Sequence, residues 1–139
     1  MQLANRKISI WGDSILKGII LDESQSRYVV LKNNCVDRFA QETNAIITNH
    51  ASFGMTTVKA FERITRSLER RPPVADDIIL VEFGGNDCDY HWADISEHPD
   101  KMHLPNTPID RFAEVLQSII EAFKSFNIDP ILMTLPPLE

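Results

Sequence analysis

Short apolar runs alternate along the chain with segments in which apolar residues recur at helical spacing. Four of the runs have the length of strands, and they occupy residues 7–11, 44–51, 77–83 and 130–135. The third run, residues 77–83, is nearly unbroken, which is typical of a strand that is covered on both faces. The alternation therefore predicts a parallel sheet whose strands are joined by crossover helices.

Amphipathic patterns between these runs predict the helices. A short helix contains Val36 and Phe39. A longer helix lies within residues 56–73, where apolar residues recur every three to four positions. Pro72 and Pro73 enforce its end, because proline cannot continue a helix.

The last predicted helix lies within residues 107–126. Thr107 is its candidate N-cap residue, and Pro108 would take the first helical position. Each predicted helix has one apolar face, which we expect to pack on the sheet.

A long segment without clear periodicity, residues 88–107, connects the third strand to the last helix. Loops of this length are more often functional than not, and ligands of open parallel sheets bind at the carboxyl ends of the strands. We therefore expect this segment to lie over a binding crevice as a lid or specificity wall. Its Tyr90 and Trp92 are candidate substrate-binding residues, unless they only pack the loop onto the body.

Composition and charge narrow the class of protein. The length of 139 residues fits a single domain over residues 1–139, and the net charge of −6 gives no electrostatic reason to expect nucleic acid. Cys35 and Cys88 lie far apart, which predicts two buried or half-buried thiols rather than a disulfide or a zinc site. No run is long enough for a signal peptide or a membrane span, so we expect a cytoplasmic protein.

Polar residues follow the first apolar run directly, as Gly12, Asp13 and Ser14. A serine at the carboxyl end of a strand, where a helix begins, lies near backbone N–H groups that stabilise developing negative charge. Ser14 is therefore a candidate nucleophile. The structural alternative is a turn at Gly12 in which Asp13 and Ser14 cap the next helix.

Two other strand ends supply possible hydrogen-bond donors. Gly84 and Gly85 let the backbone turn sharply, so that Asn86 can point its amide into the crevice. Gly54 has no side chain to obstruct its own N–H. The N–H groups of Ser14 and Gly54 and the amide of Asn86 together form a candidate oxyanion hole.

At these residues the chain resembles the SGNH hydrolases, also called GDSL-type esterases and lipases. The resemblance rests on G-D-S at residues 12–14, on Gly54 and on G-x-N-D at residues 84–87, in that order after three predicted strands. It implies a three-layer α/β/α sandwich with a parallel, flavodoxin-like sheet, in which the strands, numbered along the chain, have the order 2-1-3-4. It also implies hydrolysis of carboxylic esters or of acetyl groups on sugars without a cofactor. Ser14 would be the nucleophile, and Gly54 and Asn86 would complete the oxyanion hole.

The chain departs from the family's pattern beyond the fourth predicted strand. The family carries its general base in a D-x-x-H motif after a fifth strand, and no such motif follows residues 130–135. We therefore expect a domain truncated at its C-terminus, without the fifth strand and nearly inactive on its own. An uncovered fourth strand would favour a homo-oligomer.

Histidines within the chain could substitute for the missing base. His91, His98 and His103 lie in the long loop and could reach the crevice, whereas His50 lies in or beside the second strand. Four side chains of the same loop could suggest a metal site: Asp89, His91, Asp94 and His98. Their spacing is irregular, so solvated loop side chains are the better interpretation, and we expect no metal.

Two carboxylates lie beside the candidate oxyanion hole. Asp13 and Asp87 complete the candidate substrate-binding residues. Hydrogen bonds that hold their turns are the better interpretation, because a carboxylate facing the oxyanion would repel it.

Three functions compete. The first is a serine hydrolase of small-molecule esters that forms an acyl-enzyme on Ser14. The second is a non-catalytic protein that has no base and binds a small ligand or a partner. The third, a phosphate or nucleotide binder, is disfavoured because no strand end carries the glycine spacing of a phosphate cradle.

Overall fold

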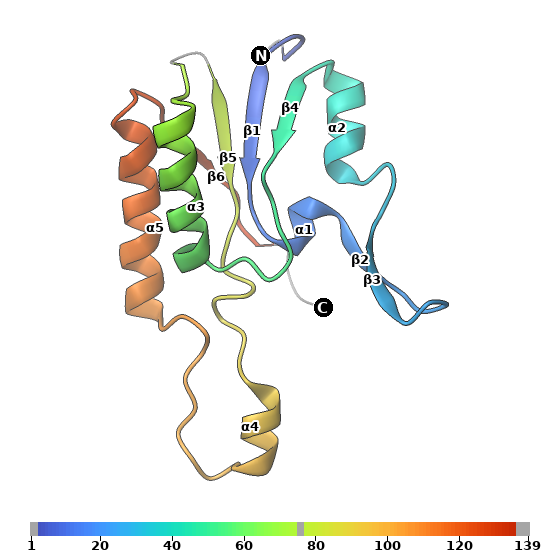
Figure 1. The fold of residues 1–139 in the computed structure, drawn as a ribbon, viewed down its shortest axis with the longest axis vertical. Helices are drawn as coiled ribbons and strands as arrows, with labels where there is room; N and C mark the ends of the chain where they lie inside the picture. Colours follow the sequence, from blue (N-terminus) through green and yellow to red (C-terminus); the bar gives the residue numbers. More distant parts are fainter. Residues whose placement is uncertain (1–2, 75–76, 136–139) are drawn as a thin grey trace.

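The computed structural model describes residues 3–74 and 77–135. Its main sheet has four parallel strands in the order β4-β1-β5-β6 (Figure 1). The strands are β1 (Lys7–Trp11), β4 (Ile46–Asn49), β5 (Ile78–Val81) and β6 (Ile131–Leu132). The predicted fold class and the predicted order of the four apolar runs are both confirmed.

The last strand is shorter than its apolar run. Only two residues of β6 pair with β5, as Leu80 with Ile131 and Val81 with Leu132. Both residues of β6 are exposed. Within the described residues β6 pairs only with β5, so its other edge has no partner strand. Association of two copies through this edge stays a prediction.

Helices cover both faces of the sheet (Figure 1). On one face lie α1 (Ser14–Lys17) and α2 (Cys35–Thr43), and on the other lie α3 (Thr57–Arg70) and α5 (Ile109–Lys124). Side chains of a strand alternate between the two faces. Accordingly, Ile8 and Ile10 join the core beneath α1 and α2, whereas Trp11 joins the core beneath α3 and α5. The fold is therefore a three-layer sandwich with two separate cores.

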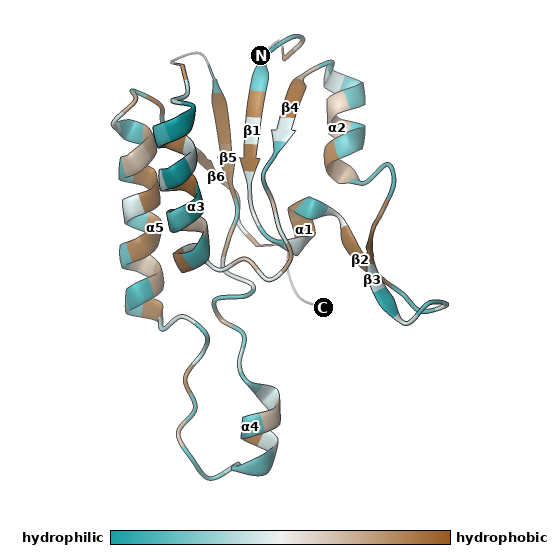
Figure 2. Cartoon of the chain, in the orientation of Figure 1, coloured by the Kyte–Doolittle hydropathy of each residue, from teal (hydrophilic) through white to brown (hydrophobic). Residues whose placement is uncertain are grey.

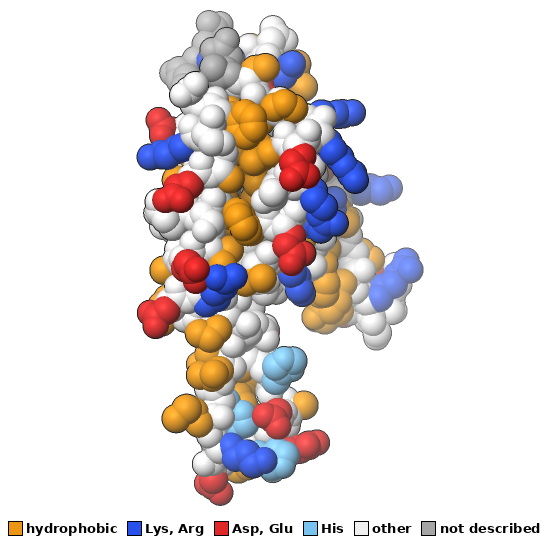
Figure 3. Space-filling model, turned by 60° about the vertical axis from the view of Figure 1, so that its left-hand side comes forward, with side chains coloured by type: hydrophobic (Ala, Val, Ile, Leu, Met, Phe, Trp, Pro, Cys, Tyr) orange, Lys and Arg blue, Asp and Glu red, His pale blue; other side chains and the backbone are white. Residues whose placement is uncertain are grey.

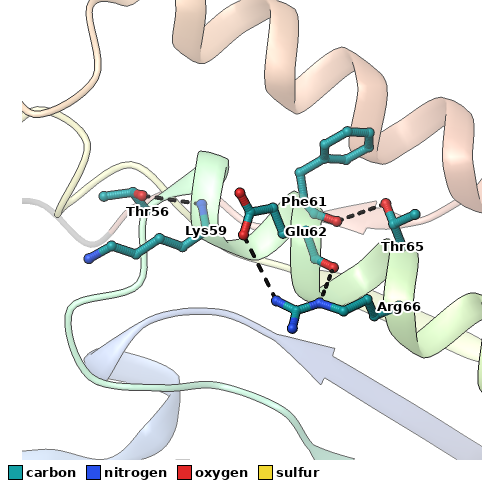
Figure 4. A network of polar contacts seen from close by, with 6 residues as sticks. All are labelled: Thr56, Lys59, Phe61, Glu62, Thr65 and Arg66. Carbon is teal, nitrogen blue, oxygen red and sulfur yellow. Dashed lines mark hydrogen bonds and ion pairs between the residues drawn. The ribbon is translucent and has the colours of Figure 1, made fainter.

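Helix α3 begins where the predicted helix does. Its N-cap residue is Thr56, whose hydroxyl accepts a hydrogen bond from the Lys59 N–H at 3.5 Å. On the exposed side of the helix, Arg66 donates to the Glu62 carbonyl at 3.2 Å and pairs with the Glu62 carboxylate (Figure 4). On the side facing α5, Figure 3 shows a stripe of apolar side chains between the two helices. The groove there is lined in part by Phe61, Leu68, Ala122 and Phe126.

Helix α5 begins one residue later than predicted. Pro108 occupies the N-cap position, and the first helical residue is Ile109. Thr107 is buried, and its backbone N–H donates to the carbonyl of Asp87 at 2.9 Å. Thr107 therefore precedes the cap, and its prediction as N-cap is wrong.

Two elements were not predicted. An antiparallel hairpin of β2 (Ile19–Asp22) and β3 (Arg27–Val30) projects beside α1, and a short helix α4 (Trp92–Glu97) lies in the long loop. The hairpin turn is held by Asp22, whose carboxylate accepts from the N–H groups of Ser24 and Gln25. Two short apolar runs around a polar turn were the available sequence signal.

None of the described helices is long and apolar enough to cross a membrane.

Candidate functional site

The nucleophile turn connects β1 to α1. Ser14 is the first residue of α1, and within the described residues its hydroxyl makes no hydrogen bond. Gly12 lets the turn pass close to its neighbours, since a Cβ there would lie 2.8 Å from the side chain of Leu16 and 3.0 Å from that of Glu82. The serine hydroxyl is therefore placed at the carboxyl edge of the sheet and left free of side-chain partners.

Asp13 holds this turn through hydrogen bonds of its buried side chain. Its side chain is buried, and one carboxyl oxygen accepts the N–H of Ile15 at 2.8 Å, which caps α1. The other oxygen accepts the amide of Asn86 at 3.1 Å. Burial, and to a lesser extent the charge of Asp87, raises the pKa of Asp13. Asp13 thus joins the nucleophile turn to the turn after β5.

The glycine loop after β4 presents Gly54 to solvent. Gly54 has a φ of +65°, and no atom lies within 4 Å of the position that its Cβ would take. A residue with a side chain would be strained there by the backbone conformation and not by crowding. The carbonyl of Gly54 accepts from the Lys59 ammonium at 3.2 Å, and its N–H makes no hydrogen bond within the described residues.

Asn86 lies where the three turns meet. Its amide nitrogen donates to Asp13 at 3.1 Å and to the carbonyl of Met55 at 3.1 Å. Both amide hydrogens are therefore engaged, which the sequence could not indicate. A substrate oxygen would have to compete with these two acceptors for an Asn86 N–H.

Asp87 connects the turn after β5 to the start of α3. Both of its carboxyl oxygens accept the N–H of Thr57 at 3.0 Å, and one accepts the Thr57 hydroxyl at 2.6 Å. Both side chains are buried. These contacts agree with the interpretation of Asp87 as a residue that holds its turn.

Sequence reasoning missed Glu82, a third buried carboxyl group at this edge. One of its oxygens accepts the N–H of Asp13 at 3.5 Å, and the other, Oε1, has no hydrogen-bond partner within the described residues. Burial, and next the charge of Asp13, raises the pKa of Glu82. An acidic residue at the end of a strand expected to be covered on both faces was the available signal. We call Asp13, Glu82, Asn86, Asp87 and Thr57 the strand-end cluster.

The arrangement of strands and turns has counterparts among solved structures. It is similar to the SGNH-hydrolase family esterase AlinE4, at 23% identity and a TM-score of 0.63, over 93% of this chain and 58% of that chain. The chain has the fold of the SGNH hydrolases. The fold resemblance inferred from the sequence is thereby confirmed. No protein-family model and no curated protein matches the sequence.

Two further structures carry the same SGNH hydrolase fold. A lipase/acylhydrolase from Enterococcus faecalis is 26% identical, with a TM-score of 0.59, over 91% of this chain and 55% of that chain. A catalytic mutant of Axe2, an acetylxylan esterase from Geobacillus stearothermophilus, is 19% identical, with a TM-score of 0.63, over 96% of this chain and 61% of that chain. The chain thus spans 55% to 61% of the length of these three structures.

In this SGNH hydrolase fold, an apolar cavity of about 270 Å³ lies at the end of β5. Its lining includes Asp87 of the strand-end cluster together with Phe83, Tyr90 and Phe112. Trp92 is not part of this lining; it is exposed, and its indole N–H donates to Asp89 at 2.7 Å. The structure therefore brings Tyr90, but not Trp92, to a cavity beside the candidate site.

Residues 88–107, which we call the excursion, extend beyond the strand ends instead of lying across them (Figure 1). Asp94 binds both of its histidine neighbours, His98 and His103, at 3.2 Å each. The two ends of the excursion contribute Cys88, Tyr90, Pro105 and Thr107 to the lining of the cavity, so the role of this segment as a lid or specificity wall stays a prediction.

The remaining histidine lies on the sheet. His50 stacks on Trp11 with a ring separation of 4.1 Å, and burial, followed by the charge of Arg63, lowers its pKa. Within residues 3–74 and 77–135, no group of three or more acidic, histidine or cysteine side chains could hold a metal ion. Cys35 and Cys88 are free and exposed, so the expected burial of these thiols is wrong.

Proposed function

We propose that the protein is a serine ester hydrolase in which Ser14 forms an acyl-enzyme. The observation that carries the proposal is the meeting of three strand-end turns around one amide, since Asn86 donates both to Asp13 of the nucleophile turn and to Met55 beside Gly54. These two hydrogen bonds hold Ser14 and the turns that carry Gly54 and Asn86 together at one edge of the sheet. The esterases and lipases that share the fold support a general hydrolase function.

The reaction would begin with attack of the Ser14 hydroxyl oxygen on the ester carbonyl. The negative charge on the carbonyl oxygen would be stabilised by the N–H groups of Ser14 and Gly54 and by the Asn86 amide, and a single such donor is typically worth about 3 kcal/mol. The alcohol would leave with the proton taken from the serine, and water would then hydrolyse the acyl-enzyme to release the acid.

Asn86 can contribute only if the oxyanion competes successfully for one of its N–H groups. A charged oxyanion is a stronger hydrogen-bond acceptor than the neutral carbonyl of Met55. The Asn86 N–H that donates to Met55 would therefore be the one released to the oxyanion, while the bond to Asp13 holds the amide.

The expected rate of hydrolysis depends on whether a general base contacts Ser14. Within the described residues, the Ser14 hydroxyl has no hydrogen bond to a histidine or a carboxylate. In a well-studied serine protease, loss of the base lowers kcat about 10⁶-fold. We therefore expect residues 1–139 on their own to turn over esters very slowly.

The same absence of a base contact favours the second candidate function. A protein with this cleft and an unactivated serine would bind a small ligand without hydrolysing it. The cavity beside Asp87 and Tyr90 would then serve as the binding site.

The test is the intact mass of the protein before and after treatment with a fluorophosphonate, which modifies activated serines. Because Ser14 has no base contact, we expect a single adduct to form slowly, to disappear in Ser14→Ala and to persist in Ser118→Ala, a matched serine on α5. An adduct that persists in Ser14→Ala would place the nucleophile elsewhere. No adduct on any serine would exclude an activated Ser14 in this chain and leave the ligand-binding function.

A further inference from the structure

Exposed apolar side chains surround the nucleophile turn on the side of the β2–β3 hairpin. Their exposed fractions run from 45% at Ile15 to 62% at Tyr28. We call this set the apolar wall, and its members are Ile15, Leu21, Tyr28, Val30 and Phe53. Contiguous exposed apolar side chains are typical of a surface that binds a ligand, a membrane or another protein.

The hairpin residues of the wall share one face. Leu21 and Tyr28 are directly paired across the strands, and Val30 lies two residues beyond Tyr28 on the same strand. Paired residues and residues two apart project to the same side of a β-ribbon. Leu21, Tyr28 and Val30 therefore present a continuous apolar strip.

Two contacts connect this strip to the candidate site. The Tyr28 ring packs against the Phe53 ring at 5.0 Å, and Phe53 immediately precedes Gly54. The N–H of Leu31 donates to the carbonyl of Gly18 at 2.8 Å, which anchors the base of the hairpin to the end of α1. The wall therefore runs from the hairpin to the loop that carries a proposed oxyanion donor.

The wall also reaches the nucleophile itself. Ile15 directly follows Ser14, and nearly half of its surface is exposed. Residues adjacent in the chain to both the nucleophile and Gly54 thus leave apolar surface open to solvent.

The tip of the hairpin is polar, which argues against insertion into a lipid surface. Residues 22–27 read Asp-Glu-Ser-Gln-Ser-Arg, and Asp22 binds the side chains of Ser24 and Gln25. Figure 2 shows the hydrophobic part of the hairpin at its end nearest α1 and hydrophilic residues farther out. The apolar surface is thus concentrated next to the site.

We propose that the apolar wall binds the acyl chain of the ester substrate, which makes Tyr28 a specificity-determining residue. This inference rests on the proposed function of Ser14. Substrates with an apolar acyl chain of several carbons would be preferred to acetyl esters, because each methylene that is removed from water against the wall favours binding.

Alkyl fluorophosphonates of different chain length test the proposal, since their phosphorus takes the place of the acyl carbonyl carbon. We expect the octyl probe to modify Ser14 at least about ten-fold faster than the ethyl probe, with the rate followed by intact mass. In Tyr28→Ser and Leu21→Ser the ratio should fall severalfold, whereas Tyr28→Phe, which keeps the ring, should preserve it. Val74→Ser is the matched control, because Val74 has an exposed fraction of 59% and lies on another part of the surface.

A second measurement separates failure of the wall from failure of the proposed function. Octanoate is titrated into the protein while the methyl NMR signals of Leu21 and Val30 are followed. If neither probe modifies Ser14, the hydrolase proposal fails, but shifts at these methyls that Tyr28→Ser abolishes would still support the wall. If Ser14 is labelled, an unchanged chain-length ratio in Tyr28→Ser would overturn the inference. If Ser14 is not labelled, the absence of methyl shifts with octanoate would overturn it.

Self-association or vesicle binding that is lost in Tyr28→Ser, without any effect of octanoate, would also overturn it. The apolar wall would then bind a second copy of the chain or a lipid surface.

Discussion

The strand-end cluster and the excursion use similar polar residues in opposite surroundings. In the strand-end cluster, Asp13 and Asp87 are buried, and each accepts a backbone N–H, from Ile15 of the same turn and from Thr57 of another turn respectively. In the excursion, the Asp94 side chain is 57% exposed and pairs with two histidines of the same segment. Burial makes the hydrogen bonds of the two regions differ in importance. A buried carboxyl group without partners is destabilised by its loss of hydration, whereas an exposed carboxyl group stays hydrated.

The comparison also separates long-range from local contacts. Hydrogen bonds of the strand-end cluster join residues that lie far apart in the chain, such as Asp13 with Asn86 and Thr57 with Asp87. The contacts of Asp94 instead stay within the excursion, on His98 and His103. We therefore expect changes in the strand-end cluster to affect the whole fold and changes at Asp94 to remain local.

The largest effect is expected for Asp87→Ala. This change leaves the N–H and the hydroxyl of Thr57 buried without partners, and we expect a loss of about 4 kcal/mol in the free energy of unfolding. Urea denaturation measures it. Thr57→Val, which removes the hydroxyl alone, should cost less. A loss below about 1 kcal/mol for Asp87→Ala would show that the buried contacts do not stabilise the fold.

A smaller loss is expected for Asn86→Ala. The change removes two hydrogen bonds, to Asp13 and to Met55, and we expect a loss of about 2 kcal/mol. Asn106→Ala is the matched control, because its amide donates a single exposed bond to the Asn86 carbonyl. Equal losses in the two variants would contradict the distinction between the half-buried amide of Asn86 and the exposed amide of Asn106.

The next prediction concerns pH and Glu82. The pKa of Glu82 is raised above its ordinary value of 4.5 by burial and by Asp13. Between the ordinary and the raised pKa, the unfolded chain releases this proton while the folded protein retains it, so stability falls as the pH rises. Glu82→Gln removes this contribution.

We therefore expect the difference in unfolding free energy between Glu82→Gln and wild type to move in favour of the variant as the pH rises above about 4.5. Denaturation of both proteins across that range measures the difference. The contribution of Asp13, whose pKa is also raised, is present in both proteins. Parallel stability curves would mean that Glu82 titrates in the fold as it does in the unfolded chain.

The smallest effect is expected for Asp94→Ala. Exposed pairs with histidine contribute little, so we expect a change within about 0.5 kcal/mol at neutral pH. The same denaturation experiment measures it. A loss comparable to that of Asp87→Ala would remove the contrast between the two regions.

Much of the fold could be predicted from local patterns. Strands β1, β4 and β5 follow short apolar runs, and α3 and α5 follow apolar residues at helical spacing. The hairpin was missed although its two apolar runs flank a polar turn, because it forms no part of the main sheet. The start of α5 was misplaced by one residue, because Pro108 takes the N-cap position and no side-chain hydrogen bond caps this helix within the described residues.

The candidate site could be predicted only in outline. Ser14, Gly54 and Asn86 were expected at one edge because the carboxyl ends of parallel strands meet there. The engagement of both Asn86 hydrogens and the buried carboxyl of Glu82 were not predicted, since each depends on residues distant in the chain. The direction in which the excursion extends from the sheet could likewise not be predicted, because its sequence has no clear periodicity.

The sequence by itself determined the four strands of the main sheet and the helices α2, α3 and α5, and hence that three polar turns lie together at the end of a parallel sheet. It could do so because hydrophobic periodicity and turn residues act through neighbours in the chain. Only the tertiary structure decided which carboxyl groups are buried, which acceptors hold Asn86, and which apolar side chains of the hairpin stay exposed beside Ser14. Burial and hydrogen-bond partners depend on packing between distant segments, and no local pattern encodes them.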